Sequence, residues 1–271
     1  MLIKIYLDII KINKIVRILK VNEPFPVKLS PVPIISAVVE IKFIPNLPND
    51  AVFGALYPLL NKRFPNLNKL PILQVPSDIR DRDPQFMNSP HYELFDNENN
   101  ILKILLGPGV LAIVFNKTSN EYPGWTEYIE KEIQEIYSDV FESKIVKKVT
   151  RFGIRYTDFF DTNIFKNTEF NILQNDYNIA LNEKVQIVRN FEKENFFHNV
   201  VLSNNAAINV DGIDKMGSII DIDSYIDNPN DNFQSEYKKY LSNGHAINKK
   251  QFFTILKKEF IDSNFTTEYK G

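Results

Sequence analysis

The chain has 271 residues, of which 44% are hydrophobic, 13% aromatic and 24% charged, and its formal net charge is −2. This composition can form a buried core, and it lacks the high net charge of a disordered chain. The small net charge gives no global electrostatic argument for binding to nucleic acid or to an anionic membrane. The absence of cysteine excludes disulfides, thiolate metal sites and cysteine nucleophiles.

Residues 1–22 are expected to form an N-terminal amphipathic helix or extension, because apolar residues recur there at helical spacing. Lys4, Asp8 and Lys11 interrupt the apolar run, as do further basic residues up to Lys20. A spanning helix needs about 20 mostly apolar residues, and a signal peptide needs an uninterrupted apolar region. We therefore expect no transmembrane segment and a cytoplasmic location.

Residues 23–162 are expected to form a first α+β domain. The strand at 36–44 alternates between apolar and polar residues, with Val39, Ile41 and Phe43 on one face and Glu40 on the other. We expect this strand to be central and to neighbour the strand that carries Arg151. The predicted order is β-α-β-β-β-β-α-β, with strands at 36–44, 70–75, 91–95, 101–106, 110–116 and 145–160 and helices at 49–63 and 124–140.

Residues 163–271 are expected to form a second α+β domain, in which strands are followed by two helices. The predicted elements are a short helix at 171–181, strands at 184–192, 196–203, 206–211 and 216–226, and helices at 231–241 and 248–262. The fold class is therefore α+β, with mainly antiparallel sheets and helices packed on one face.

The segment Gly107-Pro-Gly-Val-Leu-Ala112 matches the glycine pattern of a dinucleotide-binding turn. That function requires a helix directly after the glycines, because the pyrophosphate binds at a helix N-terminus. The β-branched and aromatic residues of 110–115 predict a strand instead. We interpret the segment as a hairpin turn.

An acidic cluster suggests the first candidate site. It comprises Asp211, Asp214, Asp221, Asp223, Asp227 and Asp231. Asp221 and Asp223 are two residues apart on a predicted strand, so both point to the same side, where two carboxylates could hold Mg²⁺. The alternative is that the two carboxylates accept hydrogen bonds from arginines or face solvent.

Arg151, Gly153 and Arg155 share one face of the strand at 145–160. The two guanidiniums could bind a phosphate. They could also neutralise acids on neighbouring strands, and Glu40 and the Asp221/Asp223 pair are the candidates for that structural role. No serine, histidine or phosphate-loop motif identifies a catalytic residue, so none is assigned.

Several segments occur in an order that resembles a sporadically distributed family of bacterial and archaeal proteins about 250–270 residues long. They are Pro31–Phe43 (PVPIISAVVEIKF), Tyr122-Pro-Gly-Trp125, Arg151-Phe-Gly-Ile-Arg-Tyr156, Ile220-Asp-Ile-Asp223, His245 and Phe252-Phe-Thr254. The resemblance extends over residues 31–262. It implies no particular activity, and a patchy distribution implies an accessory-genome cargo such as a defence or toxin–antitoxin locus.

Three functions from different classes follow. The first is a non-catalytic binding or interaction protein whose partner is another protein or a second copy of the chain. The second is a Mg²⁺-dependent phosphoesterase or nuclease, in which Asp221 and Asp223 hold the metal while Arg151 and Arg155 bind phosphate. The third is nucleic-acid binding through an open sheet face, which would require a basic stripe.

Overall fold

The computed structural model describes residues 25–80, 82–98, 101–117, 122–169, 184–210 and 212–269. The helices expected over residues 1–22 and 171–181 lie outside these ranges. In the part of the chain that is described, no helix is both long enough and apolar enough to cross a bilayer. The chain divides into two compact units, Pro33–Lys257 and a smaller one made of Met1–Val32 with Lys258–Gly271.

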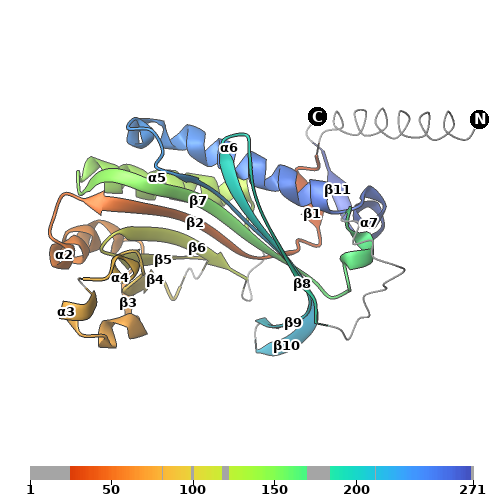
Figure 1. Ribbon diagram of the computed structural model, residues 1–271, viewed down its shortest axis with the longest axis horizontal. Coiled ribbons are helices and arrows are strands. Elements are labelled where there is room, and N and C mark those ends of the chain that lie inside the picture. The colour runs from red at the N-terminus through yellow and green to blue at the C-terminus, as the bar shows by residue number, and fades with distance from the viewer. Residues whose placement is uncertain are drawn as a thin grey trace, which may run out of the picture. The chain divides into compact units, whose positions relative to one another are not determined.

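The larger unit contains one nine-stranded sheet in the order β3-β4-β5-β6-β2-β7-β10-β9-β8 (Figure 1). All eight neighbouring pairs are antiparallel. The strands are β2 (Ile34–Pro45), β3 (Asn66–Lys69), β4 (Tyr92–Phe95), β5 (Leu102–Gly107), β6 (Val110–Asn116), β7 (Val146–Phe160), β8 (Gln186–Lys193), β9 (Phe196–Val210) and β10 (Ile213–Asp227). The predicted α+β class with an antiparallel sheet is confirmed.

Helices α2 (Asn49–Leu60), α5 (Glu130–Glu142) and α6 (Phe233–Ile255) pack on one face of this sheet (Figure 1). The π-helical turn η2 (Trp125–Ile129) precedes α5. Ile129, Ile133, Ile136 and Val140 recur at helical spacing and are all buried, which fixes the face that α5 turns to the sheet. The remaining short helical segments are η1 (Pro71–Gln74), α3 (Ser77–Arg80), α4 (Pro84–Met87) and η3 (Phe165–Asn167).

Alternation along β2 separates a buried face from an open face. Val39, Ile41 and Phe43 are buried in the core, whereas Glu40 and Lys42 on the other face are only half-buried. β2 lies between β6 and β7, and Glu40 is directly opposite Gly153. The expected central position beside the strand of Arg151 is therefore confirmed.

The strand order is similar on the two sides of the boundary between β2 and β7, with five strands on one side and four on the other. On one side β2 pairs with β6, the last strand before α5. On the other side β7 pairs with β10, the last strand before α6. Strands from both predicted domains thus form one continuous sheet, and the boundary expected at 162/163 is not visible as a break in it.

The smaller unit contains a two-stranded antiparallel sheet of β1 (Lys28–Ser30) and β11 (Thr266–Glu268) together with helix α7 (Lys258–Asn264). The backbone N–H of Val27 donates to the carbonyl of Glu268 at 2.6 Å. This contact joins segments from the two ends of the described chain.

Three predicted elements differ from the structure. The strand expected at 70–75 is η1, which has Pro71 in its first turn, and the strand lies before it as β3. The strands expected at 196–203 and 206–211 are one strand, β9, with an irregularity in its pairing to β10 between Gly217 and Ile219. The segment after Gly107 is a hairpin turn as predicted, because Gly107 pairs with Val110.

The third difference is α6 (Phe233–Ile255), which joins the helix expected at 231–241 to the first part of the helix expected at 248–262, while α7 (Lys258–Asn264) overlaps the remainder. A Cβ on Gly244 would lie 2.9 Å from a methyl carbon of Ile154, so this glycine allows α6 to approach β7 closely. The helix instead ends at Ile255, where Leu256 is extended.

Candidate functional site

The sequence-predicted site residues meet on the open face of three neighbouring strands. β2 supplies Glu40, β7 supplies Arg151 and Arg155, and β10 supplies Asp221 and Asp223. The register places Glu40 opposite Gly153, and Arg155 opposite Asp223. Because side chains alternate along a strand, residues of the same parity on these strands project from one face. We call these five side chains the arginine–carboxylate network.

Arg151 bridges two carboxylates from the two neighbouring strands. Its Nη1 donates to Glu40 Oε1 at 2.7 Å and its Nη2 donates to Asp223 Oδ2 at 2.6 Å. The guanidinium also lies over the ring of Tyr225, 4.4 Å from its centroid. Burial raises the pKa of Asp223, Arg151 opposes that rise, and the nearby Glu40 adds to it. Arg151 thus holds two acids together that would otherwise repel each other.

Arg155 makes a two-pronged contact with Asp221. Its Nε donates to Oδ1 at 2.8 Å and its Nη2 donates to Oδ2 at 2.5 Å. The hydrogen bond to Asp221 raises the pKa of Arg155 further, against the effect of burial. The Arg155 side chain is 55% exposed, whereas that of Asp221 is 13% exposed. The pair therefore presents a guanidinium to solvent above a sheltered carboxylate.

Asp221 and Asp223 lie on the same side of β10 as predicted, but each is held by a different arginine. A hard cation such as Mg²⁺ binds several oxygens. The carboxylate oxygens that could supply them accept hydrogen bonds from guanidinium groups here. Within the described ranges, no group of three or more acidic or histidine side chains is placed to hold a metal ion. The geometry matches the structural role proposed for Arg151 and Arg155.

Aromatic side chains extend the network toward β9. The ring of Tyr225, which lies against Arg151, is stacked on Phe197 with 5.6 Å between the centroids. Phe197 is 40% exposed. An exposed aromatic and a guanidinium that both contact Tyr225 give this part of the open face apolar and polar contact groups.

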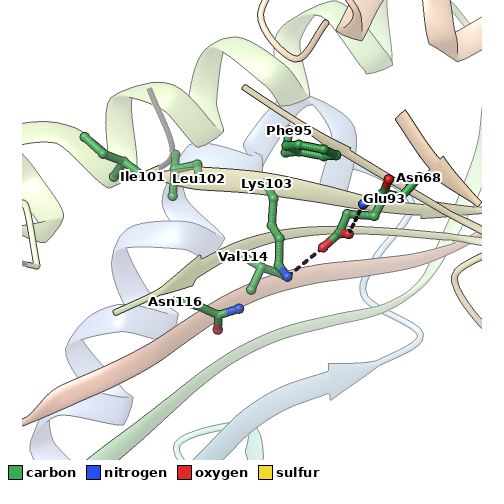
Figure 2. A pocket seen from close by; sticks show the side chains of 8 residues that line it. All are labelled: Asn68, Glu93, Phe95, Ile101, Leu102, Lys103, Val114 and Asn116. Atoms are coloured by element: carbon green, nitrogen blue, oxygen red, sulfur yellow. Dashed lines mark hydrogen bonds and ion pairs between the residues drawn. The ribbon is translucent and has the colours of Figure 1, made fainter. Parts of the chain in front are cut away.

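A shallow hollow lies on the same face over β3 to β6 (Figure 2). Its volume is about 190 Å³, and its lining residues are Asn68, Glu93, Phe95, Ile101, Leu102, Lys103, Val114 and Asn116. Lys103 Nζ lies 2.6 Å from Glu93 Oε1, and Asn68 donates to Glu93 Oε2 at 3.1 Å. Burial alone would raise the pKa of Glu93, but the bonds from Lys103 and Asn68 lower it. The charges in the hollow thus neutralise each other.

A second cluster of motif residues lies between β7, η2 and α6 and faces the core. The rings of Trp125 and His245 are stacked, with 4.5 Å between centroids and an interplanar angle of 4°. The hydroxyl of Tyr156 is 3.0 Å from His245 Nδ1. Burial lowers the pKa of His245 to about 3, with a smaller contribution from Lys249, so its imidazole is neutral at pH 7. The family-like segments at 122–125 and 151–156 and His245 thus meet in packing contacts.

The sequence reasoning missed Tyr225 and Phe197 on the open face, and it also missed Asp158. Asp158 is 3% exposed on the core face of β7, two residues after Tyr156. Burial raises its pKa well above the usual carboxyl value, and Asp221 adds to the rise. The available signal was alternation, because Asp158 occupies a core position in the series Phe152, Ile154, Tyr156 and Phe160.

The other two histidines also make structural contacts. His198 Nδ1 is 2.9 Å from the hydroxyl of Ser224, and His91 Nε2 is 3.1 Å from the carbonyl of Phe86. Asn248 on α6 donates to the carbonyls of Ile154 and Ile222 at 3.1 and 2.8 Å. This amide fastens α6 to β7 and β10, which position the arginine–carboxylate network.

No protein-family model matches this chain, and no curated protein matches it. The resemblance to the sporadically distributed family stays an expectation from the sequence.

Proposed function

We propose that this chain is a non-catalytic binding protein that holds a protein partner on the open face of its nine-stranded sheet. The observation that carries the proposal is the internal neutralisation of that face. Lys103, Arg151 and Arg155 are each paired with a carboxylate of the same face.

Charge separates this proposal from nucleic-acid binding. A surface that binds the phosphate backbone requires unneutralised lysines and arginines. Here the paired cations are matched by Glu40, Glu93, Asp221 and Asp223, so the face attracts polyanions weakly. Tyr225 contacts both the exposed Phe197 and the guanidinium of Arg151, and aromatic residues and arginine are enriched where proteins bind proteins.

The same contacts separate it from the phosphoesterase proposal. For Asp221 and Asp223 to bind Mg²⁺, the carboxylates would have to exchange charge-assisted hydrogen bonds of 2.5–2.8 Å for metal contacts. The arginines would then be released for phosphate. The resting arrangement favours the paired state and a binding role.

The accessory-locus interpretation identifies the first partner to test, which is the product of a neighbouring gene. We expect the purified chain to bind that protein, and Phe197→Lys to weaken the binding at least about tenfold, as for an aromatic anchor. The matched control is Leu67→Lys, because Leu67 is 37% exposed but pairs with the buried Leu94 on the helix-covered face. Calorimetry measures both. Equal effects of the two substitutions would contradict a binding surface on the open face.

A second experiment with the same purified protein tests the phosphoesterase and nucleic-acid-binding alternatives. We expect millimolar Mg²⁺ or Mn²⁺ to leave the melting temperature unchanged and expect no salt-dependent binding of single- or double-stranded oligonucleotides. A metal-induced rise in melting temperature that Asp221→Asn with Asp223→Asn abolishes would support the phosphoesterase instead.

A further inference from the structure

Strand β8 forms one edge of the nine-stranded sheet. All eight of its residues pair with β9 on one side. On the other side, no strand within the described ranges pairs with it (Figure 1). The opposite edge, β3, has only four residues. β8 is therefore the longer of the two edges at which another strand can add.

β8 is exposed on both faces. Only Ile187 and Phe191 are half-buried, while the other six residues are exposed. Val188 is 55% exposed although it is apolar. An edge strand has unpaired backbone N–H and C=O groups and is a template for another strand unless side chains block it. The question is which strand fits this edge.

The side chains of β8 are complementary to those of a second β8 in one antiparallel register. A two-fold axis perpendicular to the sheet keeps the same face of both copies on the same side. Residues opposite each other must then have the same parity, so the axis lies between one residue and its equivalent in the second copy. With the axis at Asn190, Arg189 is opposite Phe191 of the second copy. Val188 is then opposite Glu192, and Ile187 is opposite Lys193. No like charges are opposite each other in this register.

The contact between arginine and aromatic ring already exists within each strand. The guanidinium of Arg189 lies 4.4 Å from the ring centroid of Phe191. Pairing about Asn190 brings the same two groups together across the interface on the same face. Moving the axis to Arg189 would place two guanidiniums opposite each other, which is unfavourable in a sheet.

We propose that two copies of this chain associate through β8, antiparallel about Asn190, and join their sheets edge to edge. The open faces of the two copies then lie on the same side. This association is independent of the proposed binding function, because it uses the strand edge and leaves the arginine–carboxylate network untouched.

Sedimentation velocity of the full chain tests the proposal between about 1 and 200 µM, a range suited to an interface of modest area. We expect a concentration-dependent monomer–dimer equilibrium. Val188→Glu places like charges opposite each other twice and should weaken the dimer at least tenfold. Val188→Lys places a cation opposite Glu192 twice and should strengthen it. Ile213→Glu is the matched control, because Ile213 is 61% exposed and lies outside β8.

The absence of cysteine from the chain permits a direct test of the register. Asn190→Cys places one thiol beside its equivalent on the two-fold axis, within the range in which opposite residues of a strand pair can be crosslinked. Mild oxidation should produce a disulfide-linked dimer in high yield. Val188→Cys faces Glu192 and should form far less.

Two outcomes would overturn the proposal. One is a monomer at every concentration, which would mean that the charges of β8 protect the edge or that another segment covers it. The other is a dimer that responds equally to Val188→Glu, Val188→Lys and Ile213→Glu, because that dimer would use a different surface.

Discussion

The guanidinium of Arg151 occupies the space where Gly153 has no side chain. A Cβ on Gly153 would lie 2.7 Å from Arg151 Nη1, which is closer than real Cβ contacts. Because Arg151 lies flat across this position, its two nitrogens reach Glu40 on one neighbouring strand and Asp223 on the other. The glycine thus determines the geometry of the network.

Gly153→Ala is expected to displace Arg151 and lower the free energy of unfolding by about 1–3 kcal/mol, because two half-buried carboxylates lose their partner. Chemical denaturation measures this change. The matched control is Gly54→Ala on α2, where nothing lies within 4 Å of the added Cβ. That substitution should stabilise the protein by about 0.5–1 kcal/mol through helix propensity. A Gly153→Ala protein as stable as wild type would contradict the proposed role.

The two arginines are expected to differ in their contribution to stability. The Arg151 side chain is 18% exposed and serves two acids, so Arg151→Ala should cost about 1–3 kcal/mol. The Arg155 side chain is 55% exposed, and solvent screens its pair, so Arg155→Ala should cost less than about 1 kcal/mol. Urea denaturation of both variants measures the difference. A larger loss of stability in Arg155→Ala than in Arg151→Ala would show that Arg155 contributes more than Arg151 to holding the strands together.

Asp158 is expected to make the protein less stable as the pH rises. Its folded pKa is above the unfolded value of about 3.9, so its contribution is full below that pH and is lost as the pH rises through the folded pKa. Asp158→Asn removes the ionisation and should raise the melting temperature at pH 8 by about 2–4 °C, with a smaller gain at pH 4. Asp161→Asn, at an exposed position just after β7, is the control. Equal shifts at both pH values would contradict the assignment.

His245 is expected to make the protein less stable as the pH falls. Its folded pKa of about 3 lies below the unfolded value of about 6.5. Its contribution to stability is therefore present above pH 6.5 and is lost as the pH falls toward 3. Imidazole NMR signals of His245 should not titrate between pH 8 and 5. In His245→Gln, the melting temperature should fall less between pH 6.5 and 4 than it does in wild type. Titration of His245 near pH 6.5 would place the ring in solvent.

Local sequence patterns predicted much of the fold, because the alternation and type of residues along a short segment determine whether it forms a strand and which face is buried. Alternation located β2, whereas a β-branched and aromatic run located β6. The two-residue period of a strand then assigned Glu40, Arg151 and Asp223 each to one face of its strand. Charge complementarity then indicated which of these would pair. The gap expected between residues 241 and 248 is helical, and Gly244 within it lies where α6 approaches Ile154 closely. Asp158 was missed because a carboxylate is rarely buried, although alternation along β7 assigns it to the core face.

The central pairing of β2 with β7 has a consequence for how the protein folds. The hairpin of β5 and β6 connects neighbouring segments and can form early, whereas Arg151 and Glu40 on the central pair are 111 residues apart. Closing so long a loop costs entropy before any contact compensates for it. The strands β3 to β6 on one side and β8 to β10 on the other are therefore expected to form first. The pairing of β2 with β7 is expected to limit the folding rate.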